Sequence, residues 1–564
     1  MATRLLTLLA TLLVTFLLSA CGGSDSAPAP APVPVACADL KSLSLSGASI
    51  ASATAVPAGT FSPAAGVSLT GMPAFCRVVG TATPSNDSNI GFEVWLPASG
   101  WNGKYMQVGT QGYAGTYQYG PMAAVLKRGY ALASTDTGHA FAVPDLAGWA
   151  VGHPQKVIDF GYRAHKVTTD LAKAIVTANM AAGPKYAYFY GGSNGGREAM
   201  MAAQRYPNDF DGYVSEGPAI NWSRLSAAWV NTEQALFTDP ASAIAAAKLP
   251  AIQAATLAAC DAADGVADGF VNDPRACHFD PSVLQCAGAE TDACLTAPQL
   301  TALQRVLDGP RNPTTGLRVY PGFEPGGVNS PSWVTFITGP AVAGFLPLGF
   351  DSTLGNAFFA SLAGGGGDAV TYAYQNLNFD SGLTAAENVM IGSETLATVI
   401  NAGSTDLSGM KARGAKIIMS TGWDDPVVPA RAMIEYYESV VAGPAFNGDL
   451  AATQASFRLF MVPGLNHLTG GNGPNAMGSI FGQPGTAVDA KHDVIAALEA
   501  WVEQGIAPDS IIAAAYVGGD PTAGVARTRP LCPYPKLATW KGSGSSDDAA
   551  NFSCVDAARG AYLN

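Results

Sequence analysis

Ser193 is a serine whose surroundings suit nucleophilic chemistry. Residues 187–200 read "AYFYGGSNGGREAM" and place it between Gly191 and Gly195 in a G-x-S-x-G frame. With 64 glycines in 564 residues, this pattern alone could arise by chance. Its context is more specific, because an aromatic, strand-like run precedes the serine and a helix-compatible run follows it. Strand, sharp turn and helix together predict a nucleophile elbow, which exposes the serine hydroxyl above a sheet.

A serine nucleophile needs a histidine base, and chain order narrows the choice to two histidines. In α/β-hydrolases the triad runs serine, acid, histidine along the chain. Three histidines precede Ser193 and a fourth lies in a predicted insertion: His139, His153, His165 and His278. His492 lies in a helical pattern, where a solvated or capping role is common. His467 lies in "MVPGLNHLTGG", a glycine-bearing loop directly after a strand, and we predict it as the base.

The predicted acid lies in "STGWDDPVVP", which follows a strand and offers two carboxylates, Asp424 and Asp425. One carboxylate is enough to hold the histidine tautomer and to stabilise the imidazolium. Asp425 directly precedes Pro426, which biases it to an extended conformation, whereas Asp424 could cap the turn. Asp425 is therefore preferred, and Asp424 is the alternative.

An oxyanion hole needs two backbone N–H groups, one from the residue after the nucleophile and one from a loop near an early strand. Asn194 supplies the first. The glycine-rich loop "QVGTQGYAG" follows a predicted strand at 104–108, and within it we choose Gly112 for the second. A plain tight turn is the alternative explanation of this glycine.

These residues need a parallel sheet to bring them together, and the chain has the pattern for one. Between about residues 90 and 220, β-rich runs alternate with a helical pattern: "GFEVWLP", "KYMQVGT", "GYALASTD", "DFGYRAHKVTTDLAKAIVTANM" and "YAYFYGG". Such alternation is typical of βαβ units. We predict an α/β-hydrolase core, a doubly wound and mostly parallel sheet, over 37–217 and 413–564. Residues 218–412 have poor strand and helix signals and are predicted to form a large inserted lid domain.

The first residues predict export. "MATRLLTLLATLLVTFLLSACGG" has one arginine, a long apolar run and Leu-Ser-Ala before Cys21, and so resembles a bacterial lipoprotein signal. We predict a signal peptide over 1–20, lipidation of Cys21 and a Gly/Ser/Ala/Pro tether over 21–36. The protein would then be a membrane-anchored lipoprotein of the periplasm or cell surface. The alternative is an ordinary secretory signal and a secreted protein.

Charge and cysteine content agree with an exported protein. The net charge is −13 and no basic patch offsets it, which argues against nucleic acid as a partner. We therefore expect contact with a membrane only through the N-terminal lipid on Cys21. Without Cys21 an even number of cysteines remains, as expected in an oxidising compartment. None has the C-x-x-C spacing of a zinc site. These cysteines are Cys37, Cys76, Cys260, Cys277, Cys286, Cys294, Cys532 and Cys554.

Several longer motifs together resemble the tannase and feruloyl esterase family of α/β-hydrolases, which includes a hydrolase of a terephthalate half-ester. They are "WNGKYMQVGTQGYAG", "STDTGHA", "DFGYRAH", "GGSNGGREAMMAAQRYPNDFDG", "LRVYPGFEPGG" and "GWDDPVVP", with the His467 loop. The resemblance runs from about Cys37 to Cys554. It implies a serine carboxylic ester hydrolase with Ser193, Asp425 and His467 as its triad. It also implies the disulfides Cys37–Cys76, Cys260–Cys277, Cys286–Cys294 and Cys532–Cys554.

The lid of this family carries a calcium site, and the matching stretch is "CDAADGVADGFVNDPRAC". The resemblance implies ligation by Asp261, Asp264 and Asp268 and by the carbonyls of Val266 and Phe270. Closely spaced carboxylates suit Ca²⁺, which prefers oxygen ligands, and its role would be structural. A loop of Asp-Gly turns without a metal is the alternative. No organic cofactor is expected.

The sequence departs from the family at one pair of positions. The family usually places cysteines just before the nucleophile and just after the histidine, and they form a disulfide. Here these positions hold Gly192 and Leu468. Because both partners are absent together, no free thiol is left, and we expect a looser His467 loop. The departure bears on the choice of substrate and not on the reaction.

The resemblance implies a small-molecule substrate with an aromatic acyl group, of the hydroxycinnamoyl, galloyl or benzoyl type. A pocket for a free carboxylate would need an arginine, but no Lys or Arg occurs from Val319 to Met410, so a terephthalate half-ester is not the expected substrate. "NSPSWVTFITG" and "GFLPLGF" offer apolar lining instead. A peptidase and a non-catalytic surface lipoprotein on a hydrolase scaffold are the alternative functions, and the oligomeric state stays open.

Overall fold

One large sheet organises the chain. In the computed structural model, which describes residues 33–143, 145–339 and 349–560, nine strands form a mixed sheet in the order β1-β4-β5-β7-β6-β8-β9-β12-β13. These strands are β1 (Ala48–Val56), β4 (Phe75–Ala82), β5 (Ile90–Pro97), β6 (Lys104–Val108), β7 (Ala131–Thr135), β8 (Tyr186–Gly192), β9 (Gly212–Glu216), β12 (Lys416–Gly422) and β13 (Phe457–Val462).

The sheet is antiparallel at one side and parallel at the other. The pairs β1–β4, β4–β5 and β5–β7 are antiparallel, whereas all pairs from β7 through β6, β8, β9 and β12 to β13 are parallel. The carboxyl ends of β6, β8, β9, β12 and β13 therefore meet at one edge, where α/β sheets bind ligands. The predicted mostly parallel sheet is confirmed, and β8 has the bounds that the aromatic run "YAYFYGG" predicts.

Side chains alternate between two hydrophobic cores, one on each face of the sheet. Phe189 packs with one core and its neighbours Tyr188 and Tyr190 pack with the other, as the two-residue period of a strand requires. Buried residues of α3, α4 and α13 belong to the first core, and those of α1 and α15 to the second. These helices are α1 (Tyr119–Lys127), α3 (Ala164–Met180), α4 (Asn194–Arg205), α13 (Arg431–Ala442) and α15 (Val494–Gln504), with the short α2 (Pro154–Ile158) and α14 (Leu450–Gln454) beside them.

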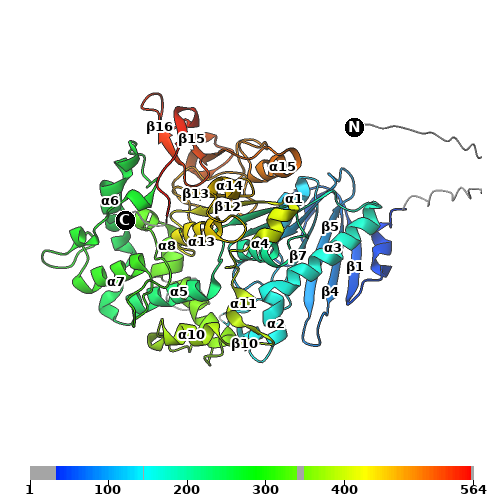
Figure 1. The fold of residues 1–564 in the computed structure, drawn as a ribbon, viewed down its shortest axis with the longest axis horizontal. Helices are drawn as coiled ribbons and strands as arrows, with labels where there is room; N and C mark the ends of the chain where they lie inside the picture. Colours follow the sequence, from blue (N-terminus) through cyan, green and yellow to red (C-terminus); the bar gives the residue numbers. More distant parts are fainter. Residues whose placement is uncertain (1–32, 144, 340–348, 561–564) are drawn as a thin grey trace, which may run out of the picture.

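The lid segment, residues 218–412, adds helices but no described strand to the large sheet. Its helices, green to yellow in Figure 1, are α5 (Trp222–Phe237), α6 (Leu249–Cys260), α7 (Ala297–Asp308), α8 (Pro331–Trp333), α9 (Phe350–Ala357), α10 (Ser381–Glu387), α11 (Leu396–Ile400) and α12 (Ser408–Arg413). They are more regular than the sequence pattern indicates. In α5 nearly every side chain is buried, so it has no polar stripe to mark it as a helix. The predicted domain boundaries stay a prediction.

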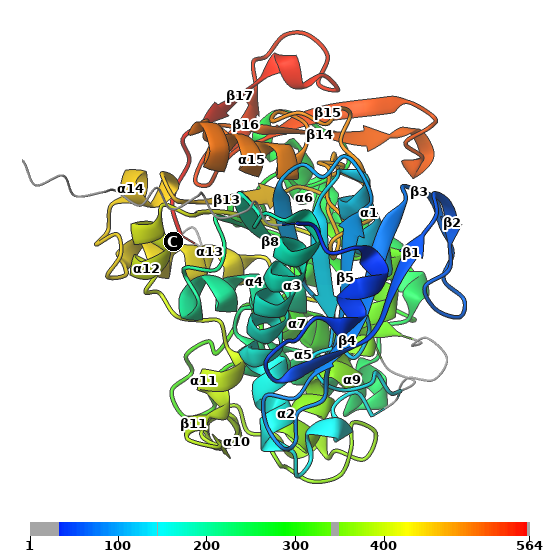
Figure 2. The ribbon, with the colours of Figure 1, turned by 90° about the vertical axis from the view of Figure 1, so that its right-hand side faces the viewer.

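Four small two-stranded sheets complete the fold. They are β2 (Gly59–Phe61) with β3 (Leu69–Met72), β10 (Met390–Ile391) with β11 (Glu394–Thr395), β14 (Ile511–Tyr516) with β15 (Val525–Leu531), and β16 (Leu537–Trp540) with β17 (Phe552–Val555). The last two sheets lie at the top of Figure 2, far from α10 and α11 at the bottom.

The cysteines of the described chain form four disulfides with the pairing that the resemblance implies. They are Cys37–Cys76, Cys260–Cys277, Cys286–Cys294 and Cys532–Cys554. Disulfides suit an oxidising compartment and are therefore consistent with export. The predicted signal peptide over 1–20, Cys21 and most of the 21–36 tether lie outside the described residues.

Among the described residues, Pro240–Asp264 is long and apolar enough to cross a membrane by length and composition alone. In the structure this stretch is divided between short turns and α6, and Cys260 binds it to Cys277. Lys248 in the same stretch is buried and donates to the carbonyl groups of Thr291 and Cys294, both at 2.6 Å. The stretch is thus part of the lid segment's own packing.

Candidate active site

Ser193 lies on a strained turn between β8 and α4. Its backbone angles, φ 59° and ψ −122°, are rarely adopted by residues other than glycine. The turn is held because the Ser193 N–H donates to the carbonyl of Glu216 on β9 at 2.8 Å. A Cβ on Gly191 would lie 2.0 Å from the Gly195 carbonyl oxygen, so this position of the frame needs a glycine. The geometry is that of the predicted nucleophile elbow.

Asp425 and His467 meet at the same edge of the sheet, after β12 and β13. His467 Nδ1 lies 2.8 Å from Asp425 Oδ2. The other carboxylate oxygen of Asp425 accepts the N–H groups of Val427 at 2.8 Å and Val428 at 2.9 Å, which fixes the side chain. Asp425 is 2% exposed, so this pair is largely shielded from water. Of the two carboxylates in "GWDDPVVP", the structure brings Asp425 to the histidine.

Asp424 points elsewhere, towards the backbone of Gly326 and Gly327 in the lid segment. It is buried, and both of its carboxylate oxygens lack a hydrogen-bond partner among the described residues. Burial, with a smaller contribution from the charge of Glu324, raises the pKa of Asp424 to about 7. A buried, unpaired carboxylate destabilises a fold when it is ionised.

We therefore expect Asp424→Asn to stabilise the protein at alkaline pH. Between about pH 4 and the folded-state pKa of about 7, the folded protein keeps a proton that the unfolded chain has lost. The free energy of unfolding of the wild type consequently falls as the pH rises through this range, and asparagine removes this dependence. Thermal unfolding should show the variant gaining a few °C on the wild type between pH 5 and pH 8. Parallel melting curves at both pH values would contradict the assignment.

One cavity joins the predicted nucleophile and the predicted base. It has a volume of about 620 Å³, and Ser193, His467 and Gly112 line it. Five aromatic rings also line it, three from the core and two from the lid segment: Tyr117, Tyr119, Phe141, Phe336 and Phe350. No Lys or Arg lines the described part of the cavity. Phe336 and Phe350 lie in the runs expected to give apolar lining, although residues 344–348 of the second run lie outside the described residues.

The three core aromatics were not singled out from the sequence. A signal was present, because Tyr117 and Tyr119 follow the glycine-rich loop directly. Gly112 in this loop has φ +52° and borders the cavity, and its role in an oxyanion hole stays a prediction. Asn194 is the first residue of α4, so its N–H has no acceptor within the helix.

Leu468 fills the space beside Gly192, where the family usually has a disulfide. A Cβ on Gly192 would lie 2.9 Å from a methyl group of Leu468 and 3.0 Å from the ring of Phe481. Leu468 has φ +63°, an uncommon angle for this residue type. The expected looser His467 loop stays a prediction, but the structure shows packed apolar atoms where the bridge would lie.

Three other histidines make contacts away from the cavity's reacting groups. His139 stacks on the ring of Trp149 at 3.8 Å, and burial lowers the pKa of His139 to about 4. His153 contacts Asp87 at 2.8 Å. His492 contacts Asp489 at 2.8 Å and precedes the first residue of α15. The interpretation of His492 as a helix residue is therefore wrong, since the helix begins only after its N-cap.

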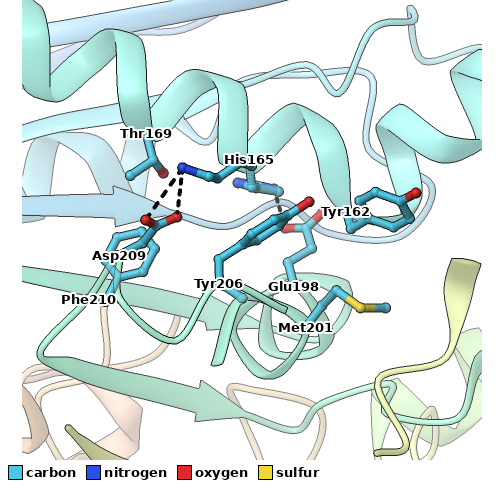
Figure 3. Close-up of a pocket in the computed structure, with 11 residues that line it drawn as sticks. Tyr162, His165, Thr169, Glu198, Met201, Tyr206, Asp209 and Phe210 are labelled. Carbon is cyan, nitrogen blue, oxygen red and sulfur yellow. Dashed lines mark hydrogen bonds and ion pairs between the residues drawn. The ribbon is translucent and has the colours of Figure 1, made fainter. Parts of the chain in front are cut away.

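His165 lies on α3 and faces α4. Its Nε2 atom lies 2.8 Å from Glu198 Oε2, and both side chains are buried. Figure 3 shows this pair in the crevice between the two helices, with Tyr162 and Met201 nearby.

The loop expected to bind calcium, residues 261–270, packs against the C-terminal sheets. Asp261 accepts the backbone N–H of Asp268 at 3.0 Å, and Asp268 contacts the guanidinium group of Arg529 on β15. Gly265 and Gly269 take positive φ angles, which allow the loop to wrap tightly. Among the residues with described coordinates, no three acidic, histidine or cysteine side chains gather as a metal site.

The loop suits calcium by its chemistry but not by its present pairing. Its candidate ligands are all oxygens, as Ca²⁺ prefers. In the structure, however, the cationic Arg529 already contacts one carboxylate oxygen of Asp268, so an ion would share this carboxylate with Arg529.

The fold and the site together define a class of protein. A mostly parallel, doubly wound sheet with a strained serine after β8 and a histidine–carboxylate pair after β12 and β13 is an α/β-hydrolase. Residues 76–555 match the family model described as tannase and feruloyl esterase. The chain therefore belongs to the tannase and feruloyl esterase family and is a carboxylic ester hydrolase.

Several esterases match this chain along nearly their whole length. An uncharacterized esterase of Xanthomonas campestris pv. campestris is 52% identical, with 93% of this chain and 92% of that protein covered. The mono(2-hydroxyethyl) terephthalate hydrolase of Piscinibacter sakaiensis is 34% identical, with 86% and 85% covered. The crystal structure of feruloyl esterase B from Aspergillus oryzae matches with a TM-score of 0.80 and 25% identity over 92% of this chain and 99% of that one.

Proposed function

We propose that this esterase works through a Ser193–His467–Asp425 triad and an acyl-enzyme. His467 takes the proton of the Ser193 hydroxyl while the serine oxygen attacks the ester carbonyl. Asp425, bonded to the other ring nitrogen at 2.8 Å, holds the tautomer and stabilises the imidazolium that forms. This hydrogen bond, next to a cavity that Ser193 also lines, is the observation that carries the proposal.

The oxyanion of the tetrahedral intermediate is stabilised by the backbone N–H groups of Asn194 and Gly112. Asn194 is the first residue of α4, directly after Ser193, and Gly112 lines the cavity from the loop after β6. The intermediate then collapses, and the alcohol leaves with the proton that His467 holds. Water, deprotonated by His467, hydrolyses the acyl-enzyme and regenerates the serine.

The preferred substrate is an ester with an uncharged aromatic acyl group. Aromatic rings from the core and from the lid segment line the cavity. Without a cationic group in its described lining, the cavity offers no partner for a free carboxylate. Two relatives are named for aromatic acyl substrates, the terephthalate hydrolase and the feruloyl esterase, which supports this acyl class.

A hydrolysis panel tests this substrate class. Gallate, ferulate, benzoate, terephthalate half-ester and short aliphatic esters should be compared by kcat/KM under one condition. We expect the kcat/KM of the uncharged aromatic esters to exceed that of the aliphatic esters by at least about tenfold, because burial of one aromatic ring is worth more than 1.4 kcal/mol. It should exceed that of the half-ester by a similar factor, because the free carboxylate has no cationic partner in the described lining. Equal values for aromatic and aliphatic esters would contradict it.

We also propose that the protein is a lipoprotein anchored through Cys21 and held off the membrane by the 21–36 tether. The signal-like run before Cys21 and the Ala/Pro-rich residues after it support this arrangement. Mass spectrometry of the mature N-terminal peptide distinguishes a diacylglyceryl cysteine from a free N-terminus left by ordinary signal cleavage.

Calcium binding to the 261–270 loop is a further proposal, carried by its oxygen-only ligand set. If the ion binds, a chelator should lower the melting temperature by a few °C, since an ion at 100 times its Kd adds about 2.7 kcal/mol to folding. Asp261→Asn should lower the melting temperature and abolish the chelator's effect. The matched control is Asp292→Asn, an exposed acid of the lid segment outside the loop. Wild-type melting that is unchanged by chelator and by added Ca²⁺ would refute the proposal.

A further inference from the structure

Glu198 is a buried carboxylate that touches both halves of the proposed oxyanion hole. Its Oε2 atom accepts the backbone N–H of Thr110 at 2.8 Å. Its Oε1 atom accepts the Thr110 hydroxyl at 2.7 Å and the side-chain amide of Asn194 at 3.0 Å. Thr110 lies two residues before Gly112 in the loop after β6, while Asn194 begins α4. One side chain therefore ties the loop to the helix.

The backbones of these two elements are in direct contact. The Gly195 N–H donates to the Thr110 carbonyl at 2.8 Å. A Cβ on Gly195 would lie 2.6 Å from that same oxygen, and a Cβ on Gly109 would lie 2.8 Å from the Gly195 Cα. The Thr110 hydroxyl oxygen also accepts the Asn194 side-chain amide at 3.0 Å, so Thr110 is held by four hydrogen bonds, two of which end on Glu198.

Neighbouring groups fix the orientation and charge of this clamp. Arg197 donates from Nε to the Asn194 side-chain oxygen at 2.7 Å, so the amide nitrogen must face Glu198. Burial acts to raise the pKa of Glu198, but the nearby His165 and Arg197 side chains and the hydrogen bond from Thr110 outweigh it. The pKa lies below its ordinary value, and the side chain is a carboxylate that only accepts.

We infer that Glu198 is a positioning residue that sets the distance between the two N–H groups of the oxyanion hole. This inference deepens the proposed function and rests on it, since it requires Asn194 and Gly112 to hold the oxyanion. Glu198 touches no substrate. It acts by fixing Thr110, and through it Gly112, against the first turn of α4.

Glutamine cannot replace this carboxylate, although it has the same size. Placed at the Oε2 position, an amide nitrogen would face the Thr110 N–H, which is only a donor. Placed at the Oε1 position, it would face the Asn194 amide, which Arg197 prevents from turning. In either orientation two hydrogen-bond donors face each other, and their repulsion pushes the loop and the helix apart. Because oxyanion stabilisation depends on donor placement within about 1 Å, the effect should fall on the transition state.

The test compares Glu198→Gln with the wild type on p-nitrophenyl acetate and on phenylboronic acid, which forms a tetrahedral adduct on a serine. We expect kcat to fall about 10²-fold with KM changed less than about threefold, and the boronic acid to bind weaker by a similar factor. The matched control is Asp493→Asn, a buried carboxylate at the start of α15 that pairs with Arg128 and belongs to the opposite face of the sheet. It should lose stability but keep kcat and boronic acid affinity.

Thr110→Val provides a second variant if Glu198→Gln folds poorly. It removes both hydroxyl bonds, to Glu198 and from Asn194, at nearly constant volume and keeps the N–H bond. A loss of about tenfold in kcat is expected, again with parallel loss of boronic acid affinity. In a folded double variant the loss should not exceed that of Glu198→Gln alone, because both act on one clamp.

The outcomes separate this inference from the proposed catalytic centre. If Ser193→Ala is inactive but Glu198→Gln keeps its kcat within about threefold, the positioning role is wrong and the triad stands. A fall in kcat with unchanged boronic acid affinity would also overturn the role, because the oxyanion hole would then be intact. If Ser193→Ala keeps activity, the catalytic centre and the inference fail together.

Discussion

Ser193→Ala should abolish ester hydrolysis while the protein stays folded. Loss of a triad nucleophile lowers kcat by about 10⁴-fold to 10⁶-fold, because the remaining oxyanion hole and cavity only bind the substrate. Among the described residues the Ser193 hydroxyl has no hydrogen-bond partner, so the substitution removes no bond that stabilises the fold. Steady-state kinetics on p-nitrophenyl acetate, with circular dichroism as the folding control, measure the effect. Labelling by a fluorophosphonate probe should disappear in parallel, which also excludes a non-catalytic scaffold.

Ser193→Gly is the matched variant for the strain of the elbow. Both substitutions remove the nucleophile, but glycine adopts φ 59° and ψ −122° without a clash, whereas alanine keeps the Cβ. Ser193→Gly should therefore be as inactive as Ser193→Ala and melt at a higher temperature. Activity retained in either variant, with the fold intact, would show that another group performs the attack.

Asp425→Asn should lower kcat by about 10³-fold to 10⁴-fold with a small change in KM. An asparagine that keeps its oxygen on the backbone would turn its amide nitrogen towards His467. This nitrogen favours the wrong tautomer of the histidine and cannot stabilise the imidazolium. The carboxylate also accepts two backbone N–H groups, from Val427 and Val428, through its other oxygen. Asparagine can keep those bonds through its oxygen, so the loop should stay in place.

Asp424→Asn is the control for this prediction, because it changes the same kind of group one residue away. Asp424 faces Gly326 and Gly327 rather than His467, so its kcat at pH 8 should stay within about threefold of the wild type. A large loss in Asp424→Asn together with a small loss in Asp425→Asn would reverse the assignment of the acid.

Local patterns in the sequence were enough to predict a candidate nucleophile and a candidate base, which line one cavity in the structure. The run "YAYFYGG" is buried on both faces of a central strand, and the glycines after it permit a turn that few sequences can form. The prediction of His467 used only its position downstream of Ser193 in the chain and needed no distance between the two. The lid segment was harder, because helices such as α5 are buried nearly all round and show no amphipathic period.

Other features depend on contacts between residues far apart in the chain. Asp424 and Asp425 are adjacent and chemically equal, so their backbone pattern could only suggest a preference. The structure separates them, since one packs against the lid segment and the other bonds to His467. The Arg529 contact of the 261–270 loop joins residues about 260 positions apart and has no local signal.

The sequence by itself indicated the reaction class and predicted the nucleophile and the order of the triad, because these predictions follow from residue type, local strand–turn–helix pattern and position along the chain. The tertiary structure decided which acid meets the histidine, which rings line the cavity and that Glu198 joins the loop after β6 to α4. The physical reason is that a carboxylate's role depends on what it faces. Only the packing of β6, α3 and α4 brings Thr110, His165 and Glu198 together.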